Sequence, residues 1–202
     1  MMINKDIYKM IQIDCYKAAG DHEEKNYGKH IDKTVKAVTS KIQAAEKILD
    51  IGCGEGFTLT CFQKYLNSDY YGIELNPTKV GYAKAGNPNA TIFTGDAHDL
   101  PMKDQFFDLV YCAHVLEHCL DIDAALSEAK RVLKDNGYFY VVIPFEPENT
   151  KPYGDPVRFN KTHTHPFSSE IQIKKEFGKY FKIESMKRID LREPEYELWL
   201  TK

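Results

Sequence analysis

The chain has 202 residues, of which 43% are hydrophobic, so it can bury one sizeable core, and we expect a single domain over residues 1–202. Its 27 Lys and Arg residues against 30 Asp and Glu residues leave a formal net charge of -3, which gives no overall attraction to a nucleic-acid backbone or an anionic membrane. The composition therefore disfavours nucleic acid as a partner and favours a small-molecule substrate.

Cysteine usage and the first residues of the chain both indicate the cytoplasm. The five cysteines are scattered and form no C-x-x-C pair, which is typical of reduced thiols: Cys15, Cys53, Cys61, Cys112 and Cys119. Charged residues interrupt the apolar positions at the start of the chain, unlike the apolar region of a signal peptide. No stretch approaches the ~20 apolar residues that cross a bilayer, so we expect no membrane span.

Short β-branched or aromatic runs alternate with amphipathic stretches through the first three quarters of the chain, which is the pattern of β-α-β units around a parallel sheet. Helices are predicted at about 30–44, 57–66, 77–85 and 122–133. Strands are predicted at Lys47 to Ile51, Asp69 to Glu74, Ala90 to Thr94, Phe107 to Cys112 and Gly137 to Ile143. Residues 46–145 would thus hold the core of the domain.

After Pro144 the sequence is rich in proline and polar residues, which predicts a loop over the edge of the sheet. Ser168 is placed to cap a helix that runs to about Phe177, and strands are predicted at Tyr180 to Lys187 and Glu195 to Leu200. Their short connection predicts antiparallel pairing. The fold class is therefore α/β, with a doubly wound Rossmann-like sheet of seven strands, mostly parallel with one antiparallel strand near the C-terminus.

The first predicted strand runs into three alternate glycines in Ile48-Leu-Asp-Ile-Gly-Cys-Gly-Glu-Gly56, and a helix begins near Phe57. Gly52 and Gly54 let the backbone approach a ligand closely, and a helix N-terminus offers N–H donors. A glycine-rich turn without a ligand is the structural alternative. The next strand ends in Glu74, 24 residues beyond Asp50, where an acidic residue binds a ribose. The spacing G-x-G-x-G differs from the G-x-G-x-x-G of dinucleotide dehydrogenases and disfavours that class.

Five motifs in this order resemble the class I S-adenosylmethionine-dependent methyltransferases, and specifically their type 11 group, over about residues 45–145. They are the glycine segment, Tyr71-Gly-Ile-Glu74, Thr94-Gly-Asp-Ala97 with Leu100-Pro101, the segment from Phe107 to His118, and Leu133-Lys-Asp-Asn-Gly-Tyr138. The resemblance implies S-adenosylmethionine as cofactor and methyl transfer as the activity. It also permits residues 1–45, with Tyr27 and His30, to act as a helical lid over the cofactor, and residues 146–202 to hold the substrate loop.

The resemblance implies a set of cofactor-binding residues: Asp50, Gly52, Cys53, Gly54, Glu74, Leu75, Asp96, Ala97, Cys112 and Ala113. In this set Glu74 would hold the ribose, and Asp96 would accept a hydrogen bond from the adenine amino group. Asp50 would orient the glycine turn or contact the amine of the methionine portion. For Asp50 and Asp96 the structural alternative is capping or turn formation.

Three histidines are candidates for a general base, because imidazole titrates near neutral pH and can take a proton from a hydroxyl group. They are His114, which directly follows the fourth strand, and His163 and His165, which lie in the late loop. For each of them the alternative is a packing or hydrogen-bonding role.

The segment His114-Val-Leu-Glu-His118 also has the H-x-x-E-H spacing of inverted zinc proteases, but here it follows a strand and not a long metal-binding helix. It is similar to the E-x-x-E-H segment of magnesium-dependent small-RNA 2'-O-methyltransferases, with His114 in place of the first glutamate. We therefore expect no metal, and keep as an alternative that His114, Glu117, His118 and a later histidine bind one. In the structural reading, Glu117 and His118 simply begin a helix.

The acceptor atom is inferred from a motif that is missing. Tyr111-Cys-Ala-His114 stands where many amino-group and base methyltransferases have D-P-P-Y or N-P-P-Y, which disfavours a nucleobase nitrogen. The late lysines and arginines are interpreted as a solvated charged face. We therefore expect a methyltransferase that acts on a small molecule, at oxygen. The alternatives are an RNA 2'-O-methyltransferase with a metal site and a catalytically inactive cofactor-binding module.

Overall fold

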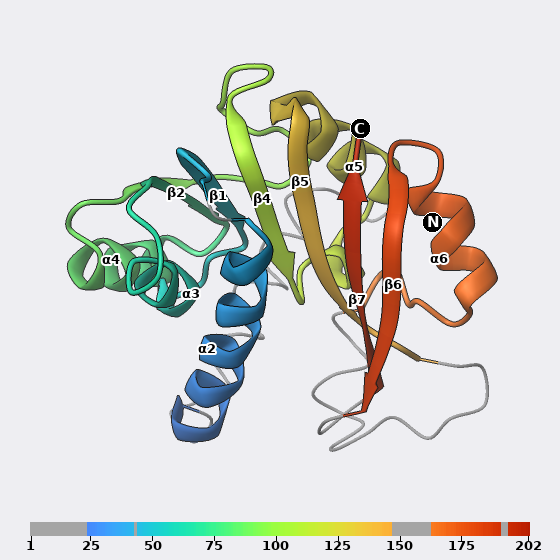
Figure 1. Ribbon diagram of the computed structural model, residues 1–202, viewed down its shortest axis with the longest axis horizontal. Coiled ribbons are helices and arrows are strands. Elements are labelled where there is room, and N and C mark those ends of the chain that lie inside the picture. Colours follow the sequence, from blue (N-terminus) through green and yellow to red (C-terminus); the bar gives the residue numbers. More distant parts are fainter. Residues whose placement is uncertain (1–23, 43, 147–162, 191–193) are drawn as a thin grey trace.

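The computed structural model of the protein describes residues 24–42, 44–146, 163–190 and 194–202. Seven strands form one sheet in the order β3-β2-β1-β4-β5-β7-β6, with helices on both faces (Figure 1). The strands are β1 (Lys47–Ile51), β2 (Asp69–Glu74), β3 (Thr91–Thr94), β4 (Phe107–Ala113), β5 (Leu133–Pro144), β6 (Lys182–Asp190) and β7 (Pro194–Thr201). The helices are α2 (Glu24–Lys41), α3 (Phe57–Phe62), α4 (Pro77–Gly86), the short 3-10 helix η1 (Leu116–His118), α5 (Ile122–Val132) and α6 (Glu170–Phe177).

The strand directions confirm the predicted fold class. Strands β1 to β5 pair in parallel, whereas β7 pairs antiparallel with β5 on one side and with β6 on the other. Figure 1 shows β7 running against its neighbours. The sheet is therefore doubly wound and mostly parallel, with one antiparallel strand near the C-terminus.

Two hydrophobic layers cover the two faces of the sheet, and β4 shows how the sequence divides between them. Leu109 and Tyr111 face the layer that contains α2, α3 and α4, whereas Val110 and Cys112 face the layer that contains α5 and α6. Successive side chains of a strand point to opposite faces, so a strand buried on both sides is apolar without interruption. This explains why β4 is apolar without interruption from Leu109 to Ala113.

Polar residues start three of the helices. The side chain of Asn76 accepts a hydrogen bond from the N–H of Thr78 at the start of α4, and Asp121 caps α5 in the same way. Helix α6 is capped by Ser169 and not, as predicted, by Ser168. Ser168 instead donates hydrogen bonds from its N–H and its hydroxyl to the side chain of Gln172.

Other element bounds differ from the predicted ones for local reasons. Helix α3 ends at Phe62 and not near residue 66, because the next turn tightens into hydrogen bonds that span three residues. Strand β5 begins at Leu133 and not at Gly137, because Leu133 already pairs with Phe107, and an irregularity in the pairing with β4 absorbs the extra residues. Strand β6 begins at Lys182, two residues later than predicted.

Helix α2 packs as a core helix. The side chains of Ile31, Val35, Val38 and Ile42 are buried in the same layer as α3 and α4. These side chains of α2 therefore belong to the core, and a lid formed by residues 1–45 stays a prediction. Residues 1–23, and with them Cys15, lie outside the described residues, as do the side chains of Tyr27 and His30 and residues 147–162 of the predicted substrate loop.

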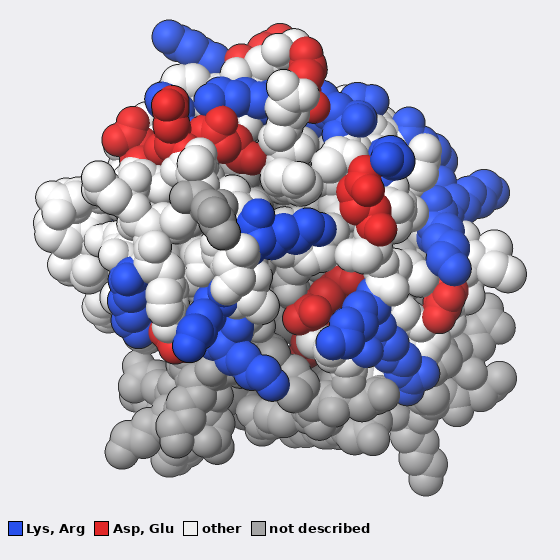
Figure 2. Space-filling model, in the orientation of Figure 1, with Lys and Arg blue, Asp and Glu red and all other residues white. Residues whose placement is uncertain are grey.

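Charged side chains of both signs lie intermixed on the face of the molecule that Figure 2 shows. In the late part of the chain Lys174 pairs with Glu170, Lys179 with Asp123 and Lys182 with Glu184. These pairs support the interpretation of this region as a solvated charged face. Within the described ranges, no helix combines the length and the apolar character that a membrane crossing requires.

Candidate active site

The ends of four neighbouring strands align at one edge of the sheet. The last residue of β1, Ile51, pairs with Ile73 on β2 and with Cys112 on β4, and Glu74 at the end of β2 pairs with Thr94 at the end of β3. The segments that follow these strands therefore share one edge. The chain reverses its winding between β1 and β4, and the carboxyl ends of strands at such a point form the usual ligand site of an open α/β sheet.

The glycine turn after β1 adopts a backbone that favours glycine. Gly52, Gly54 and Gly56 have φ angles of 73°, 54° and 85°, in the left-handed region. The N–H groups of Gly52 and Cys53 donate to the carbonyl of Ile73 at 2.8 and 3.0 Å, and the N–H of Gly56 donates to the carbonyl of Cys53. The turn is thus tied to β2 by its own backbone.

Two glycines of this turn differ in what lies around them. A Cβ atom at Gly52 would lie 2.1 Å from Cγ2 of Val115, whereas a Cβ atom at Gly54 would meet no atom within 4 Å. Gly52 is therefore required by the packing of the protein itself. Gly54 is the residue of the turn that faces open space.

Asn87 supports the turn from the end of α4. Its buried side chain donates to the carbonyl of Gly56 at 3.2 Å and accepts hydrogen bonds from Thr60 and Gln63 of the α3 segment. A Cβ atom at Gly56 would lie 2.5 Å from its amide nitrogen. This contact closes the turn against the next β-α unit.

Asp50 lies in β1, two residues before the turn, and is only 2% exposed. Its Oδ2 atom is one of three buried side-chain oxygens in the described part of the chain that have no hydrogen-bond partner. Burial, together with the negative charge of Glu74, raises the pKa of this carboxyl well above its ordinary value. A buried acceptor of this kind is suited to a cation that brings its own hydrogen-bond donors.

Glu74 is held in place by backbone groups. Its Oε2 accepts from the N–H of Gly54 at 3.1 Å, and its Oε1 accepts from the N–H of Asn76 at 2.8 Å. Each oxygen keeps a further lone pair, so this half-buried carboxylate can also accept ribose hydroxyls. Leu75, next to it, is half-buried.

Asp96 and Ala97 follow β3 and are both half-buried. Oδ1 of Asp96 accepts from the N–H of His98 at 3.1 Å and also contacts the ring of His98. The other ring nitrogen accepts from the N–H of Asp121 at 3.3 Å, which links this loop to the start of α5. The turn-forming role that the sequence allows for Asp96 is therefore present, and its role toward adenine stays a prediction.

The two cysteines of the predicted cofactor set point into the protein. Cys53 packs against Gly72, and Cys112 lies in the core, so only their backbone atoms can face a ligand. Burial raises the pKa of both thiols, so neither is a reactive thiolate. Ala113, the last residue of β4, is half-buried at the shared edge.

His114 directly follows β4 and has a φ of 56°, a conformation that is uncommon outside glycine. Its side chain is 32% exposed and lies between two carboxylates. Nδ1 is 3.6 Å from Oε1 of Glu117, and Nε2 is 3.3 Å from Oε1 of Glu195 on β7. Because both ring nitrogens face a carboxylate, the ring is oriented from two sides.

Glu117 lies in η1 and is only 1% exposed. Burial alone would raise the pKa of this carboxyl, but the hydrogen bond from His114 and the charges of His118, His114 and His163 outweigh it and lower the pKa below its ordinary value. Its Oε2 atom has no hydrogen-bond partner. Three imidazoles thus surround one buried carboxylate.

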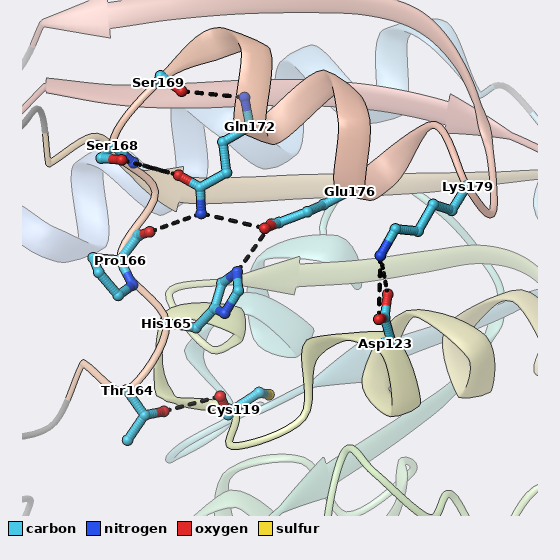
Figure 3. Close-up of polar contacts among 10 residues, drawn as sticks. All are labelled: Cys119, Asp123, Thr164, His165, Pro166, Ser168, Ser169, Gln172, Glu176 and Lys179. Atoms are coloured by element: carbon cyan, nitrogen blue, oxygen red, sulfur yellow. Dashed lines mark hydrogen bonds and ion pairs between the residues drawn. The ribbon is translucent and has the colours of Figure 1, made fainter.

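The segment that carries His163 is fastened to η1. The hydroxyl of Thr164 donates to the carbonyl of Cys119 at 2.9 Å (Figure 3). The N–H of His165 donates to the carbonyl of Glu117 at 2.9 Å. The ring of His163 lies edge-on to the ring of His118, with centroids 4.8 Å apart, and its Nδ1 contacts Glu146. His163 therefore joins the residues that follow β4.

His165 faces a different direction. Its Nε2 lies 2.9 Å from Oε2 of Glu176 on α6, and its ring packs against Phe167. Figure 3 shows the ring turned toward α6. These contacts favour a role in holding the loop against α6, and a catalytic role of His165 stays a prediction.

Four residues of this region give no signal in the sequence. Glu195 and Glu146 contact the histidines, Val115 closes the packing around Gly52, and Asn87 supports the glycine turn. Each acts on a partner that is distant in the sequence or reaches it through tertiary packing.

Comparisons with known proteins match the part of the chain that carries the glycine turn. The methyltransferase domain family matches residues 49–141. The chain is 30% identical over 132 residues to the uncharacterized methyltransferase YcgJ of Bacillus subtilis, with 63% of this chain and 52% of that protein covered. It is 30% identical over 103 residues to the demethylmenaquinone methyltransferase of Chlorobaculum parvum, with 51% and 43% covered. The chain spans about half the length of the curated relatives it matches.

Solved structures share the fold over most of the chain. The PH0226 protein of Pyrococcus horikoshii has a TM-score of 0.74 at 18% identity, with 93% of this chain and 98% of that chain covered. A SAM-dependent methyltransferase of Aquifex aeolicus has a TM-score of 0.64 at 18% identity, with 86% and 97% covered. At this identity the likeness shows the fold. Together these comparisons show that residues 49–141 are similar to the methyltransferase domain family, and that the chain shares the fold of a solved SAM-dependent methyltransferase.

Proposed function

We propose that this chain transfers a methyl group from S-adenosylmethionine to an oxygen atom of a small molecule in the cytoplasm. The observation that carries the proposal is the buried, unpartnered Oδ2 of Asp50, two residues before a glycine turn that faces open space at Gly54. A cationic amine is the ligand group that such a carboxylate favours. The methionine portion of the cofactor has such an amine.

The hydrogen bonds of the turn favour this cofactor over a dinucleotide. The N–H groups of Gly52, Cys53, Gly54 and Gly56 are all bonded within the protein, so none of these four donors is left for a pyrophosphate. The turn therefore shapes the proposed cofactor site and does not offer these N–H groups to an anion. Glu74 adds acceptors that suit ribose hydroxyls.

The remaining residues of the predicted set complete the proposed cofactor site. Asp96 and Ala97 would border the adenine, and the backbone at Cys112 and Ala113 would face the methionine amine. When bound, S-adenosylmethionine supplies a methyl group that is activated by its sulfonium sulfur. The chain itself has to align the acceptor, exclude water and remove a proton.

We assign the proton transfer to His114. It follows β4 at the shared edge, its side chain is partly exposed, and Glu117 orients its Nδ1. An acceptor hydroxyl would replace Glu195 at Nε2, and Glu195 would stabilise the ring once it is protonated. An oxygen acceptor is also favoured by Tyr111-Cys-Ala-His114, which lacks the prolines and the acidic or amide side chain of nitrogen-specific enzymes.

The substrate class is tested by turnover of labelled S-adenosylmethionine against pools of sugars, lipid precursors and phenols, with small RNA as a separate pool. We expect label in a small molecule, bound through oxygen. Label in RNA alone would replace the proposal by an RNA 2'-O-methyltransferase. Cofactor binding without turnover in any pool would indicate a binding module.

The role of His114 is tested with His114→Gln once an acceptor is known. Removing a general base lowers the rate by about 10²- to 10⁴-fold, whereas cofactor affinity should stay within about threefold of the wild type. Both quantities are measured on the same preparation. A fully active His114→Gln variant would remove His114 from the reaction.

A further inference from the structure

We propose that Glu117, His118 and His163 form a binding site for a divalent transition-metal ion. One carboxylate oxygen and two imidazole nitrogens, one from each residue, lie within 4.8 Å of one another. One carboxylate and two imidazoles are the protein ligands of many catalytic zinc and non-haem iron sites, which keep further positions open for substrate or water. From the sequence we expect no metal and keep as an alternative that His114, Glu117, His118 and a later histidine bind one; in the fold, His163 is the later histidine that lies beside Glu117 and His118.

The buried carboxylate of Glu117 is the strongest indication of a cation-binding site. It is 1% exposed, and its Oε2 atom has no hydrogen-bond partner. Burying an ionised carboxylate with an unsatisfied oxygen is costly unless a cation compensates it. A metal ion bound by Glu117 would supply both the charge and the bond.

The distances suit a metal after a small movement of the side chains. Tetrahedral bonds of about 2.1 Å place the donor atoms about 3.4 Å apart. Oε1 of Glu117 and Nε2 of His118 are 3.9 Å apart, and the ring of His163 lies edge-on to the ring of His118 with centroids 4.8 Å apart. Movements of the donor atoms by about 1 Å, through side-chain rotation, therefore bring the three ligands to bonding distance.

A further carboxylate stands where metal sites usually have one. Nδ1 of His163 contacts Glu146, and histidines that bind metals commonly donate their other N–H to a carboxylate. We therefore assign Nε2 of His163 to the metal. Two hydrogen bonds, from the hydroxyl of Thr164 and from the N–H of His165, fasten the segment that carries His163 to the region of η1. They hold the ligands in position before any ion binds.

The ligand types select the ion. Two nitrogens and one oxygen suit Zn²⁺, Co²⁺ or Fe²⁺, whereas Mg²⁺ and Ca²⁺ prefer sites made of oxygen alone. Glu117, the first ligand of the site, lies two residues after Val115, which packs against Gly52 of the glycine turn. An ion there would bind an acceptor oxygen beside the methyl donor; this last role rests on the proposed function, whereas metal binding does not.

The test uses the untagged full chain after treatment with a chelator, and no S-adenosylmethionine. Zn²⁺ and Co²⁺ are titrated by calorimetry, and the visible absorption of Co²⁺ is recorded. We expect one ion per chain, Zn²⁺ bound more tightly than Co²⁺, and d–d bands without a thiolate charge-transfer band. The absence of stoichiometric binding at millimolar ion by the folded protein would overturn the proposal, and it would leave cofactor binding unaffected.

Variants assign the ligands. Glu117→Gln and His163→Gln should each weaken Zn²⁺ binding by about 100-fold or more, and Glu146→Gln by about 10- to 100-fold. His165→Gln is the matched control, because this neighbouring histidine is held by Glu176 outside the cluster, and its metal affinity should equal that of the wild type. If Glu117→Gln does not fold, the Zn²⁺ affinity of His163→Gln tests the site in its place. Unchanged Zn²⁺ affinity in His163→Gln would contradict the site.

Discussion

The glycine turn and the histidine cluster lie at the same edge of the sheet but are built in different ways. The turn consists of neighbouring residues, and hydrogen bonds from Gly52 and Cys53 to the carbonyl of Ile73 close it. The histidine cluster consists of side chains that are distant in the sequence, and its carboxylates and imidazoles depend on one another. Its members are His114, Glu117, His118, Glu146, His163 and Glu195. Backbone shape thus defines the turn, and side-chain charge defines the cluster.

Val115 connects the two regions. It lies between β4 and η1, and it fills the space beside Gly52. Substitutions at Gly52 and Val115 should therefore have coupled effects on stability. Other substitutions in the turn and in the cluster should act independently. The predictions below test this division.

The largest effect is expected for Gly52→Ala. The new methyl group would lie 2.1 Å from Cγ2 of Val115, and the φ of 73° strains any L residue. Overpacking and strain together should lower the free energy of unfolding by about 3 kcal/mol, measured by urea denaturation. Adding Val115→Ala should restore about 1 kcal/mol of this loss. Additive effects of the two changes would contradict the contact.

The next effect concerns cofactor affinity and uses two substitutions at Gly54. Ala and Leu share the backbone strain at a φ of 54°, but only Leu fills the open space. We expect Gly54→Leu to bind S-adenosylmethionine about 100-fold more weakly than Gly54→Ala, a difference of about 2.7 kcal/mol. Calorimetry on both variants measures it. Equal affinities would show that the open space is not the cofactor site.

A smaller effect is expected from Asp50→Asn, with a defined pH dependence. Burial and Glu74 raise the pKa of Asp50 in the folded protein, so the unfolded chain ionises first, and this disfavours folding above about pH 4. Asn removes the penalty. The variant should be about 1–2 kcal/mol more stable than the wild type at pH 7, and equally stable below about pH 4. A loss of stability at pH 7 would contradict this account of Asp50.

The smallest effect is expected at the opposite edge of the sheet. Burial would raise the pKa of Asp108, but Lys134 and the N–H groups of Lys47 and Glu46 lower it below its ordinary value. The stabilisation from Asp108 is thus present above about pH 4 and is lost as the pH falls through its lowered pKa. Asp108→Asn should cost about 1 kcal/mol at pH 7 and leave cofactor affinity unchanged. A change in that affinity would show that the two edges are coupled.

The sequence predicts the strands, their order of appearance and the glycine turn, because these depend on local patterns. Alternate glycines after an apolar strand require a particular backbone, and continuous apolar runs require burial on both faces. The predicted ends of helices and strands were wrong where the local sequence is compatible with two structures. Ser168 and Ser169 are both suitable caps, and the Lys-Asp-Asn-Gly segment before Tyr138 suggests a turn, although pairing with Phe107 keeps its start in β5.

The histidine cluster could be predicted only in part. His114 and Glu117 are only three residues apart, so their proximity is local in the sequence. The pairing of His163 with Glu146, and of His114 with Glu195, depends on how the late segment packs and on where β7 inserts into the sheet. No local pattern carries that information. His165 shows the same limit, because its contact with Glu176 follows from the position of α6.

Calorimetry of the wild type and of Asp50→Asn with S-adenosylmethionine, its demethylated product and a nicotinamide dinucleotide tests the central claim most directly. The account predicts that the wild type binds both nucleosides and not the dinucleotide. It also predicts that Asp50→Asn binds S-adenosylmethionine about tenfold more weakly or worse, because the cationic amine loses its buried counter-charge. Folded wild-type protein that binds neither nucleoside at millimolar concentration, or that binds the dinucleotide instead, would contradict it.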